Sequence, residues 1–165
     1  MILKKICMLG PTSVGKTSLV ARFVQSMFAD KYLTTVGVKI DKKVMTVGTD
    51  QITLMLWDLA GDDDFQKLEM SYLRGAAGYL LVADGTRAPS VDRALEIQGR
   101  VQNVLGDVPF IFALNKADLI EQWAVPDHRI TDWTNDGWLV RKTSAKTGAG
   151  VEACFQELAE KMLKP

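Results

Sequence analysis

Two glycines, a lysine and a threonine stand at a fixed spacing near the start of the chain. Residues 10–17, Gly-Pro-Thr-Ser-Val-Gly-Lys-Thr, match the pattern GxxxxGK[ST] and are called the P-loop here. In such a loop the glycines let backbone N–H groups point at phosphate oxygens. Lys16 can reach the β- and γ-phosphates, and the Thr17 hydroxyl can bind Mg²⁺. The residues expected to hold the nucleotide here are Ser13, Val14, Gly15, Lys16, Thr17 and Ser18.

The segments on either side of the P-loop have the patterns that phosphate binding requires. An apolar run over residues 6–9 precedes it and predicts a buried strand. Leu19, Val20, Phe23 and Val24 follow at helical spacing. A strand that leads into a helix N-terminus places free N–H groups and the helix dipole at the phosphates. A chance glycine-rich turn, the alternative, does not account for both neighbours.

A second polar motif, Asn115-Lys116-Ala117-Asp118, follows the apolar run over residues 108–114. At the end of a strand, where α/β proteins bind ligands, the Asp118 carboxylate can accept the two guanine donors, N1–H and N2–H₂. Adenine has no proton on N1, so buried polar groups would be left unpaired. Asn115 is expected to tie this loop to the P-loop, and the Lys116 stem to lie on the base. The motif therefore predicts guanine selection.

A third motif, Ser144-Ala145-Lys146, follows the strand-like run over residues 138–140. The Ala145 N–H can donate to guanine O6. The tripeptide has little meaning alone and supports the guanine assignment through its position in the order of motifs.

Oxygen ligands for Mg²⁺ come from two further segments. Asp58 ends the apolar run over residues 52–57 and can hold the metal through water, while the Gly61 N–H can touch a γ-phosphate. Thr35 is a candidate second hydroxyl ligand. Two threonine hydroxyls, two phosphate oxygens and two waters would satisfy the octahedral preference of Mg²⁺. The predicted metal ligands are Thr17, Thr35 and Asp58.

These motifs, in this order, resemble those of the Ras-superfamily small GTPases, and most closely the Rab-like branch, from residue 5 to about residue 160. Residues 57–61, Trp-Asp-Leu-Ala-Gly, and residues 35–38 are the Rab-like features. Phe28 stands where the family has an aromatic ring packed edge-on to guanine. The resemblance implies a P-loop NTPase G domain over residues 1–165 and a GTP/GDP- and Mg²⁺-dependent switch. It also implies an effector protein bound to switch I, around Thr35, and to switch II, at residues 57–61, together with activating and exchange proteins.

Two positions depart from the family pattern at the expected reaction centre. The family places a glutamine after Gly61 to orient the attacking water, and here that residue is Asp62. Thr12 occupies a position that is often glycine and crowds the space for an incoming catalytic group. Residues 29–38 hold no arginine, so none is available from switch I. The candidate catalytic residues are Lys16, Thr35, Gly61 and Asp62. Two functions stay open: a slow GTPase switch, and a GTP-binding interaction module with negligible turnover.

Composition predicts one cytoplasmic domain. The chain has 165 residues and a formal net charge of +0, which argues against nonspecific nucleic-acid binding. Cys7 and Cys154 fall on an expected strand and helix, which predicts reduced core thiols. No apolar run reaches membrane-spanning length, and no prenylatable cysteine ends the sequence, so we expect no direct lipid anchor. A prokaryotic Ras-like protein, a truncated chain and a domain of a larger Roco-like chain all fit this ending.

The pattern predicts an α/β fold with a six-stranded, mostly parallel sheet, one antiparallel edge strand and about five helices. Gly48-Thr49-Asp50 predicts a hairpin. Three tryptophans between the second and third motifs, Trp123, Trp133 and Trp138, indicate either core packing or a partner surface. His128 is expected at the surface. Strands are expected near 2–9, 37–47, 51–57, 78–84, 108–114 and 138–143, and helices near 16–27, 64–74, 90–105, 127–136 and 150–163.

Overall fold

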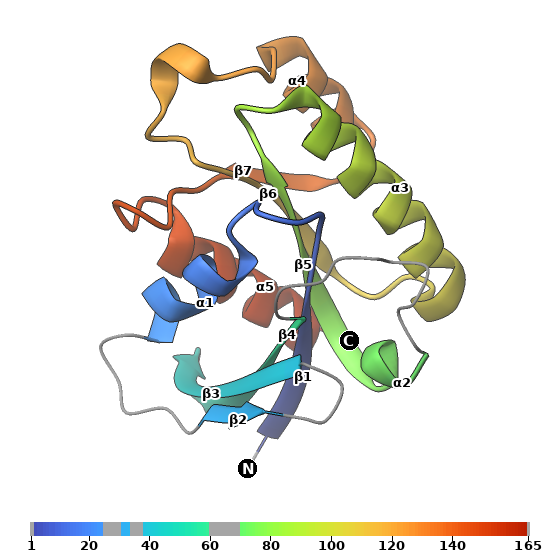
Figure 1. Ribbon diagram of the computed structural model, residues 1–165. Helices are drawn as coiled ribbons and strands as arrows, with labels where there is room; N and C mark the ends of the chain where they lie inside the picture. The colour runs from blue at the N-terminus through green and yellow to red at the C-terminus, as the bar shows by residue number, and fades with distance from the viewer. Residues whose placement is uncertain (1, 25–30, 34–37, 60–69, 165) are drawn as a thin grey trace.

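In the computed structural model, the described residues are 2–24, 31–33, 38–59 and 70–164 (Figure 1). They form one twisted sheet whose strands lie in the order β2-β3-β4-β1-β5-β6-β7. Strands β4, β1, β5, β6 and β7 are parallel, whereas β3 is antiparallel to β4 and to β2. The bounds are β1 Ile2–Leu9, β2 Lys31–Leu33, β3 Val38–Val47, β4 Asp50–Leu59, β5 Ala76–Asp84, β6 Phe110–Asn115 and β7 Leu139–Lys142.

The expected fold class is confirmed, including the hairpin between β3 and β4. The described residues also contain β2, which is a seventh strand that the sequence analysis did not predict. Its three residues, Lys31–Leu33, are too few to show an alternating pattern. Since β2 pairs with β3, β2 and not β3 is the edge strand.

Helices cover both faces of the sheet. The helices are α1 Lys16–Val24, α2 Met70–Leu73, α3 Ala88–Leu105, α4 Asp127–Asn135 and α5 Val151–Leu163, with a 3₁₀ turn, η2, at Ile120–Gln122. One buried cluster joins α1 and α5 to the sheet, and the Phe23 and Phe155 rings stack in it at 4.1 Å. The other cluster contains Tyr72 of α2 and Val91 of α3 (Figure 1). Of the expected helices, 16–27 and 64–74 extend into residues outside the described ranges.

The three tryptophans pack against the second cluster and are partly buried. Trp133 and Trp138 stack on each other and meet Phe112 edge-on. The Trp123 ring covers Gly85 so closely that a Cβ there would lie 2.2 Å from it. These contacts support core packing over a partner surface.

The two cysteines and the single histidine lie where the sequence predicted. Cys7 and Cys154 are buried free thiols, and burial raises the pKa of each to about 12, so both are protonated at neutral pH. His128 is exposed. None of the three belongs to the site described below.

Candidate nucleotide-binding site

The carboxyl ends of the parallel strands bring the polar motifs to one edge of the sheet. Strand β1 leads into the P-loop, and β4, on one side of β1, ends next to Asp58. Strand β5, on the other side, ends at Asp84, and β6 ends at Asn115. Residues 143–146 follow β7. Segments more than 130 residues apart in sequence therefore meet here.

The P-loop has a backbone shape that depends on its glycines. Gly10 has φ +150°, and a Cβ there would lie 2.2 Å from the Val82 carbonyl oxygen. Gly15 has φ +104°, and a Cβ there would lie 2.2 Å from Asn115 Nδ2. Ser13 also has a positive φ, +64°. A side chain at Gly10 would collide with the β5 backbone, and one at Gly15 would collide with the Asn115 side chain at the end of β6.

Lys16, the first residue of α1, is 8% exposed. Its Nζ donates to the carbonyl oxygens of Gly10, at 2.6 Å, and Pro11, at 3.2 Å. The ammonium group therefore lies against the loop's own backbone. An anion that enters the P-loop meets a cation that is already in place.

The predicted magnesium ligands Thr17 and Asp58 are in contact. Thr17 Oγ1 donates to Asp58 Oδ2 at 2.6 Å. Asp58 is 1% exposed, and its Oδ1 has no hydrogen-bond partner among the described residues. A buried carboxylate oxygen without a partner is costly unless a cation or water satisfies it. A hydroxyl and a carboxylate are oxygen donors of the kind that Mg²⁺ prefers, so these residues fit the metal.

Asn115 links the three loops of the site. Its Nδ2 donates to the Val14 carbonyl at 2.9 Å, as expected of a residue that ties its loop to the P-loop. Its Oδ1 accepts from Thr143 Oγ1 at 3.1 Å and from the Ala145 N–H at 3.3 Å. These three hydrogen bonds hold a side chain whose residue is only 2% exposed. It sets the distance between the P-loop and residues 143–145.

A cavity of about 420 Å³ opens between these loops. Asp118 stands at its wall, and Ser144 Oγ donates to Asp118 Oδ1 at 2.7 Å, which fixes the carboxylate. Arg22 of α1 donates to the carbonyls of Ala145 and Lys146 at 2.9 and 2.5 Å. The volume is within the range of small-molecule pockets. The lining residues are Gly15, Ser18, Asn115, Lys116, Asp118, Leu119, Ala145 and Lys146.

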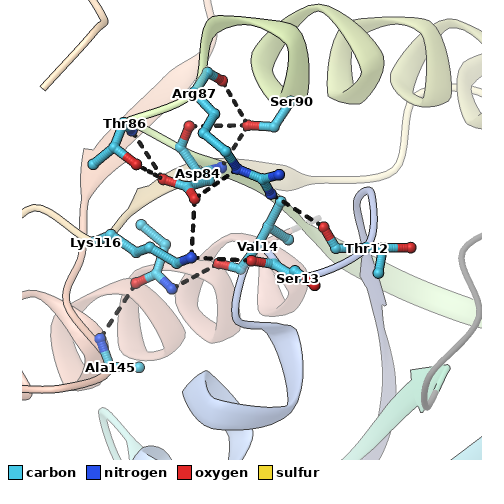
Figure 2. A network of polar contacts seen from close by, with 10 residues as sticks. Thr12, Ser13, Val14, Asp84, Thr86, Arg87, Ser90, Lys116 and Ala145 are labelled. Carbon is cyan, nitrogen blue, oxygen red and sulfur yellow. Dashed lines mark hydrogen bonds and ion pairs between the residues drawn. The ribbon is translucent and has the colours of Figure 1, made fainter. Parts of the chain in front are cut away.

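Lys116 contacts the P-loop and Asp84 (Figure 2). Its Nζ donates to the Ser13 carbonyl at 3.1 Å and lies 2.9 Å from Asp84 Oδ2. Burial alone would raise the pKa of Asp84, but hydrogen bonds from Thr86, Lys116 and Arg87 outweigh it and lower that pKa to about 2. Asp84 is therefore ionised at neutral pH.

Some residues of the site lie outside the sequence motifs. Thr143, Leu119, Asp84, Arg87 and Arg22 contact the loops but belong to none of the motifs. A hydroxyl directly after a strand, as at Thr143, is a weak signal that could have been used. The predicted residues Phe28, Thr35, Gly61 and Asp62 lie outside the described ranges.

The family assignment comes from comparison with known proteins. A model of the Ras family matches residues 5–164 of this chain. The chain belongs to the Ras family. Ras-related protein Rab-4 of Dictyostelium discoideum is 36% identical over 157 residues, which cover 93% of this chain and 76% of that protein.

Other relatives of this Ras-family protein also have Rab names. Ras-related protein RABC1 of Arabidopsis thaliana is 34% identical over 164 residues, covering 97% of this chain and 77% of the relative. Ras-related protein Rab5A of rice is 32% identical over 167 residues, covering 97% and 80%. The chain is thus a Rab-like, GTP-binding small GTPase. In the described part of the chain, no helix is long and apolar enough to cross a bilayer.

Proposed function

We propose that this protein is a molecular switch that binds GTP or GDP in the cavity between the P-loop and the loops after β6 and β7. The observation that carries the proposal is the set of hydrogen bonds around Asn115. One buried side chain joins the P-loop, through Val14, to Thr143 and Ala145. Phosphates at the P-loop and a base at Asp118 would then be held at a set separation.

The loops after β6 and β7 contain the residues that recognise the base. Asp118 accepts the guanine N1–H and N2–H₂, and the Lys116 stem covers one face of the ring. The Ala145 N–H, whose hydrogen bond to Asn115 Oδ1 is long at 3.3 Å, is then shared between Asn115 and guanine O6. Phe28 packs edge-on to the base, as the family resemblance implies. Ser144 fixes the Asp118 carboxylate, so it is already oriented before the base arrives.

The P-loop N–H groups and Lys16 bind the phosphates. When Mg²⁺ is bound, it neutralises charge on the β- and γ-phosphates. Thr17 and Asp58 would hold the ion, and the buried Asp58 Oδ1 has no hydrogen-bond partner among the described residues. Thr35 adds a hydroxyl in the triphosphate state.

Switching and hydrolysis follow from the segments that contain Thr35 and Gly61. In the GTP state, Thr35 and the Gly61 N–H hold switch I and switch II, and both relax after hydrolysis. We expect hydrolysis to be slow, because Asp62 offers no amide to orient water and stabilise the transferring phosphoryl group. Effector, activating and exchange proteins would read or set the switch state in the cytoplasm.

One sequence observation favours a second function, a GTP-binding interaction module with negligible turnover. Asp62 places a carboxylate where the family has an amide, and Thr12 crowds the same region. GTP turnover by the purified protein in Mg²⁺ separates the two. A measurable rate supports the switch, and no rate above the spontaneous one supports the module.

The guanine assignment is tested by competition binding with a fluorescent GDP. Unlabelled GTP and GDP should compete strongly, and ATP should not. Asp118→Asn should shift preference toward xanthine nucleotides, since the C2 carbonyl of xanthine accepts from the new amide. Asp127→Asn, an exposed acid at the start of α4, is the matched control and should leave the preference unchanged. Comparable ATP and GTP affinity in the wild type would contradict the proposal.

A further inference from the structure

Asp84, the last residue of β5, binds two cations with one oxygen. Lys116 Nζ lies 2.9 Å and Arg87 Nε 3.0 Å from Asp84 Oδ2. The other oxygen, Oδ1, accepts from the Thr86 N–H at 2.9 Å and from Thr86 Oγ1 at 2.6 Å. The Asp84 side chain is 2% exposed. A buried carboxylate with four donors holds those donors in fixed positions.

The two cations also contact consecutive carbonyls of the P-loop (Figure 2). Lys116 donates to Ser13 O at 3.1 Å, and Arg87 Nη2 donates to Thr12 O at 3.3 Å. Between these carbonyls lies Ser13, whose φ of +64° is uncommon for a residue with a side chain. The pair of contacts therefore holds the part of the P-loop whose backbone is under strain.

Both the backbone and the guanidinium group of Arg87 are held by hydrogen bonds. Its backbone precedes α3, and its carbonyl and the Asp84 carbonyl both lie within hydrogen-bond distance of Ser90 Oγ, at 2.8 and 2.9 Å. Its guanidinium uses Nε for Asp84 and Nη2 for the P-loop. A planar guanidinium can make both contacts at once, whereas an ammonium on a shorter, flexible stem cannot reproduce the geometry.

We propose that Arg87, anchored by Asp84, is a positioning residue that holds the P-loop at Thr12 in the shape that receives the nucleotide phosphates. The inference rests on the proposed function, because it assumes that the P-loop binds those phosphates. Arg87 acts through the loop carbonyl and is not a catalytic residue. Its loss should weaken the binding of phosphate-bearing ligands and spare recognition of the base.

The test is the dissociation rate of fluorescent GDP from purified Mg²⁺-loaded protein. Arg87→Ala should release GDP about fivefold faster, an effect suited to one charge-assisted hydrogen bond on a half-exposed side chain. Arg87→Lys should not restore the wild-type rate. Arg93→Ala is the matched control, because Arg93 lies on α3, the helix that Arg87 precedes, and its side chain forms an ion pair with Glu96 at 2.9 Å. The Arg93→Ala rate should equal the wild-type rate.

Two further readouts separate positioning from general destabilisation. Guanosine has the base and no phosphate. Its inhibition constant, measured by competition with fluorescent GDP, should be the same for the wild type and Arg87→Ala. Asp84→Asn should accelerate GDP release more than Arg87→Ala, and adding Arg87→Ala to it should change the rate by less than twofold, because the anchor is already lost.

The outcomes distinguish the two proposals. If the wild type binds GDP but Arg87→Ala releases it at the Arg93→Ala rate, the inference is wrong and the proposed function stands. If Arg87→Ala weakens guanosine and GDP equally, Arg87 does not act through the P-loop and the inference is also wrong. If the wild type fails to bind GDP at all, both the proposed function and the inference are overturned.

Discussion

Asp58 and Asp84 lie at the ends of the two strands that flank β1, on opposite sides of the strand that leads to the P-loop. Both are 1% exposed. Asp84 meets two cations and the Thr86 donors, and its pKa is lowered to about 2. Asp58 accepts one hydrogen bond from the neutral Thr17 hydroxyl, and its Oδ1 has no partner among the described residues.

The comparison of these two carboxylates indicates which buried acid holds protein groups in place and which is free to bind a ligand. A buried carboxylate whose oxygens both have donors in the protein, such as Asp84, holds those donors in fixed positions. A buried carboxylate with one oxygen unpaired, as Asp58 is among the described residues, has an acceptor that a cation or water can satisfy. We therefore expect that removing Asp58 changes metal dependence and that removing Asp84 changes stability and P-loop order.

The largest expected effect is on metal-dependent binding. Asp58→Ala or Thr17→Ala should lower GDP affinity in Mg²⁺ by about 100-fold, the upper range for losing a group that holds or orients a metal. Titration of fluorescent GDP measures it. In excess chelator the variants and the wild type should bind alike, because the ion is absent in each case. A loss that persists in chelator would show that Asp58 is as structural as Asp84.

The next effect is on folding. Asp84→Asn should lower the free energy of unfolding by about 2 kcal/mol, somewhat less than for breaking a fully buried pair, since both cationic partners reach solvent. Urea unfolding at the same nucleotide load measures it. Asp92→Asn, which removes an exposed ion pair with Arg129, is the control and should change stability by at most about 0.5 kcal/mol. Equal effects would contradict the role given to Asp84.

A third effect depends on pH. The pKa of Asp84 is about 2 in the folded protein and 3.8 ordinarily, so the folded state binds the proton more weakly than the unfolded state does. The stability that Asp84 contributes is then fully present above about pH 4 and is lost as the pH falls toward 2. The gap in unfolding free energy between wild type and Asp84→Asn should be flat from pH 7 to 5 and should close below pH 4. A gap that closes near pH 6 would assign the effect to another group.

The smallest expected effect concerns a third carboxylate, Asp62, which lies outside the described residues. Intrinsic hydrolysis should be at or below the ~10⁻⁴ s⁻¹ scale of an unassisted family member. Asp62→Gln should raise it by about tenfold, less than one well-placed donor can give, because Thr12 still crowds the site. Single-turnover GTP hydrolysis measures the rate.

Asp62→Ala is the matched variant, since it removes the charge without adding an amide. It should change the rate little or raise it slightly, because a like charge beside the γ-phosphate is gone. A rate that falls to the spontaneous level would show that Asp62 positions water or accepts a proton, and that our account of this residue is wrong.

The fold class, the family resemblance and the meeting of the polar motifs at one edge of the sheet could all be predicted from the sequence. Each rests on local pattern: apolar runs mark the strands, and glycine spacing marks the P-loop. The placement of Asn115 beside Val14 and of Ser144 beside Asp118 follows from parallel strands ending at one edge. The roles of these residues toward nucleotide stay predictions.

The residues outside the motifs that support the site are defined by the packing of the fold. Arg87 reaches Thr12 across 75 positions of sequence, and Arg22 reaches Ala145 across 123. Neither arginine differs in local pattern from a solvated surface charge. Strand β2 was missed because three residues cannot show a period, and its pairing with β3 is what makes it a strand. Sequence spacing predicts contacts that regular elements impose, whereas long side chains that bridge separate elements depend on the packed fold.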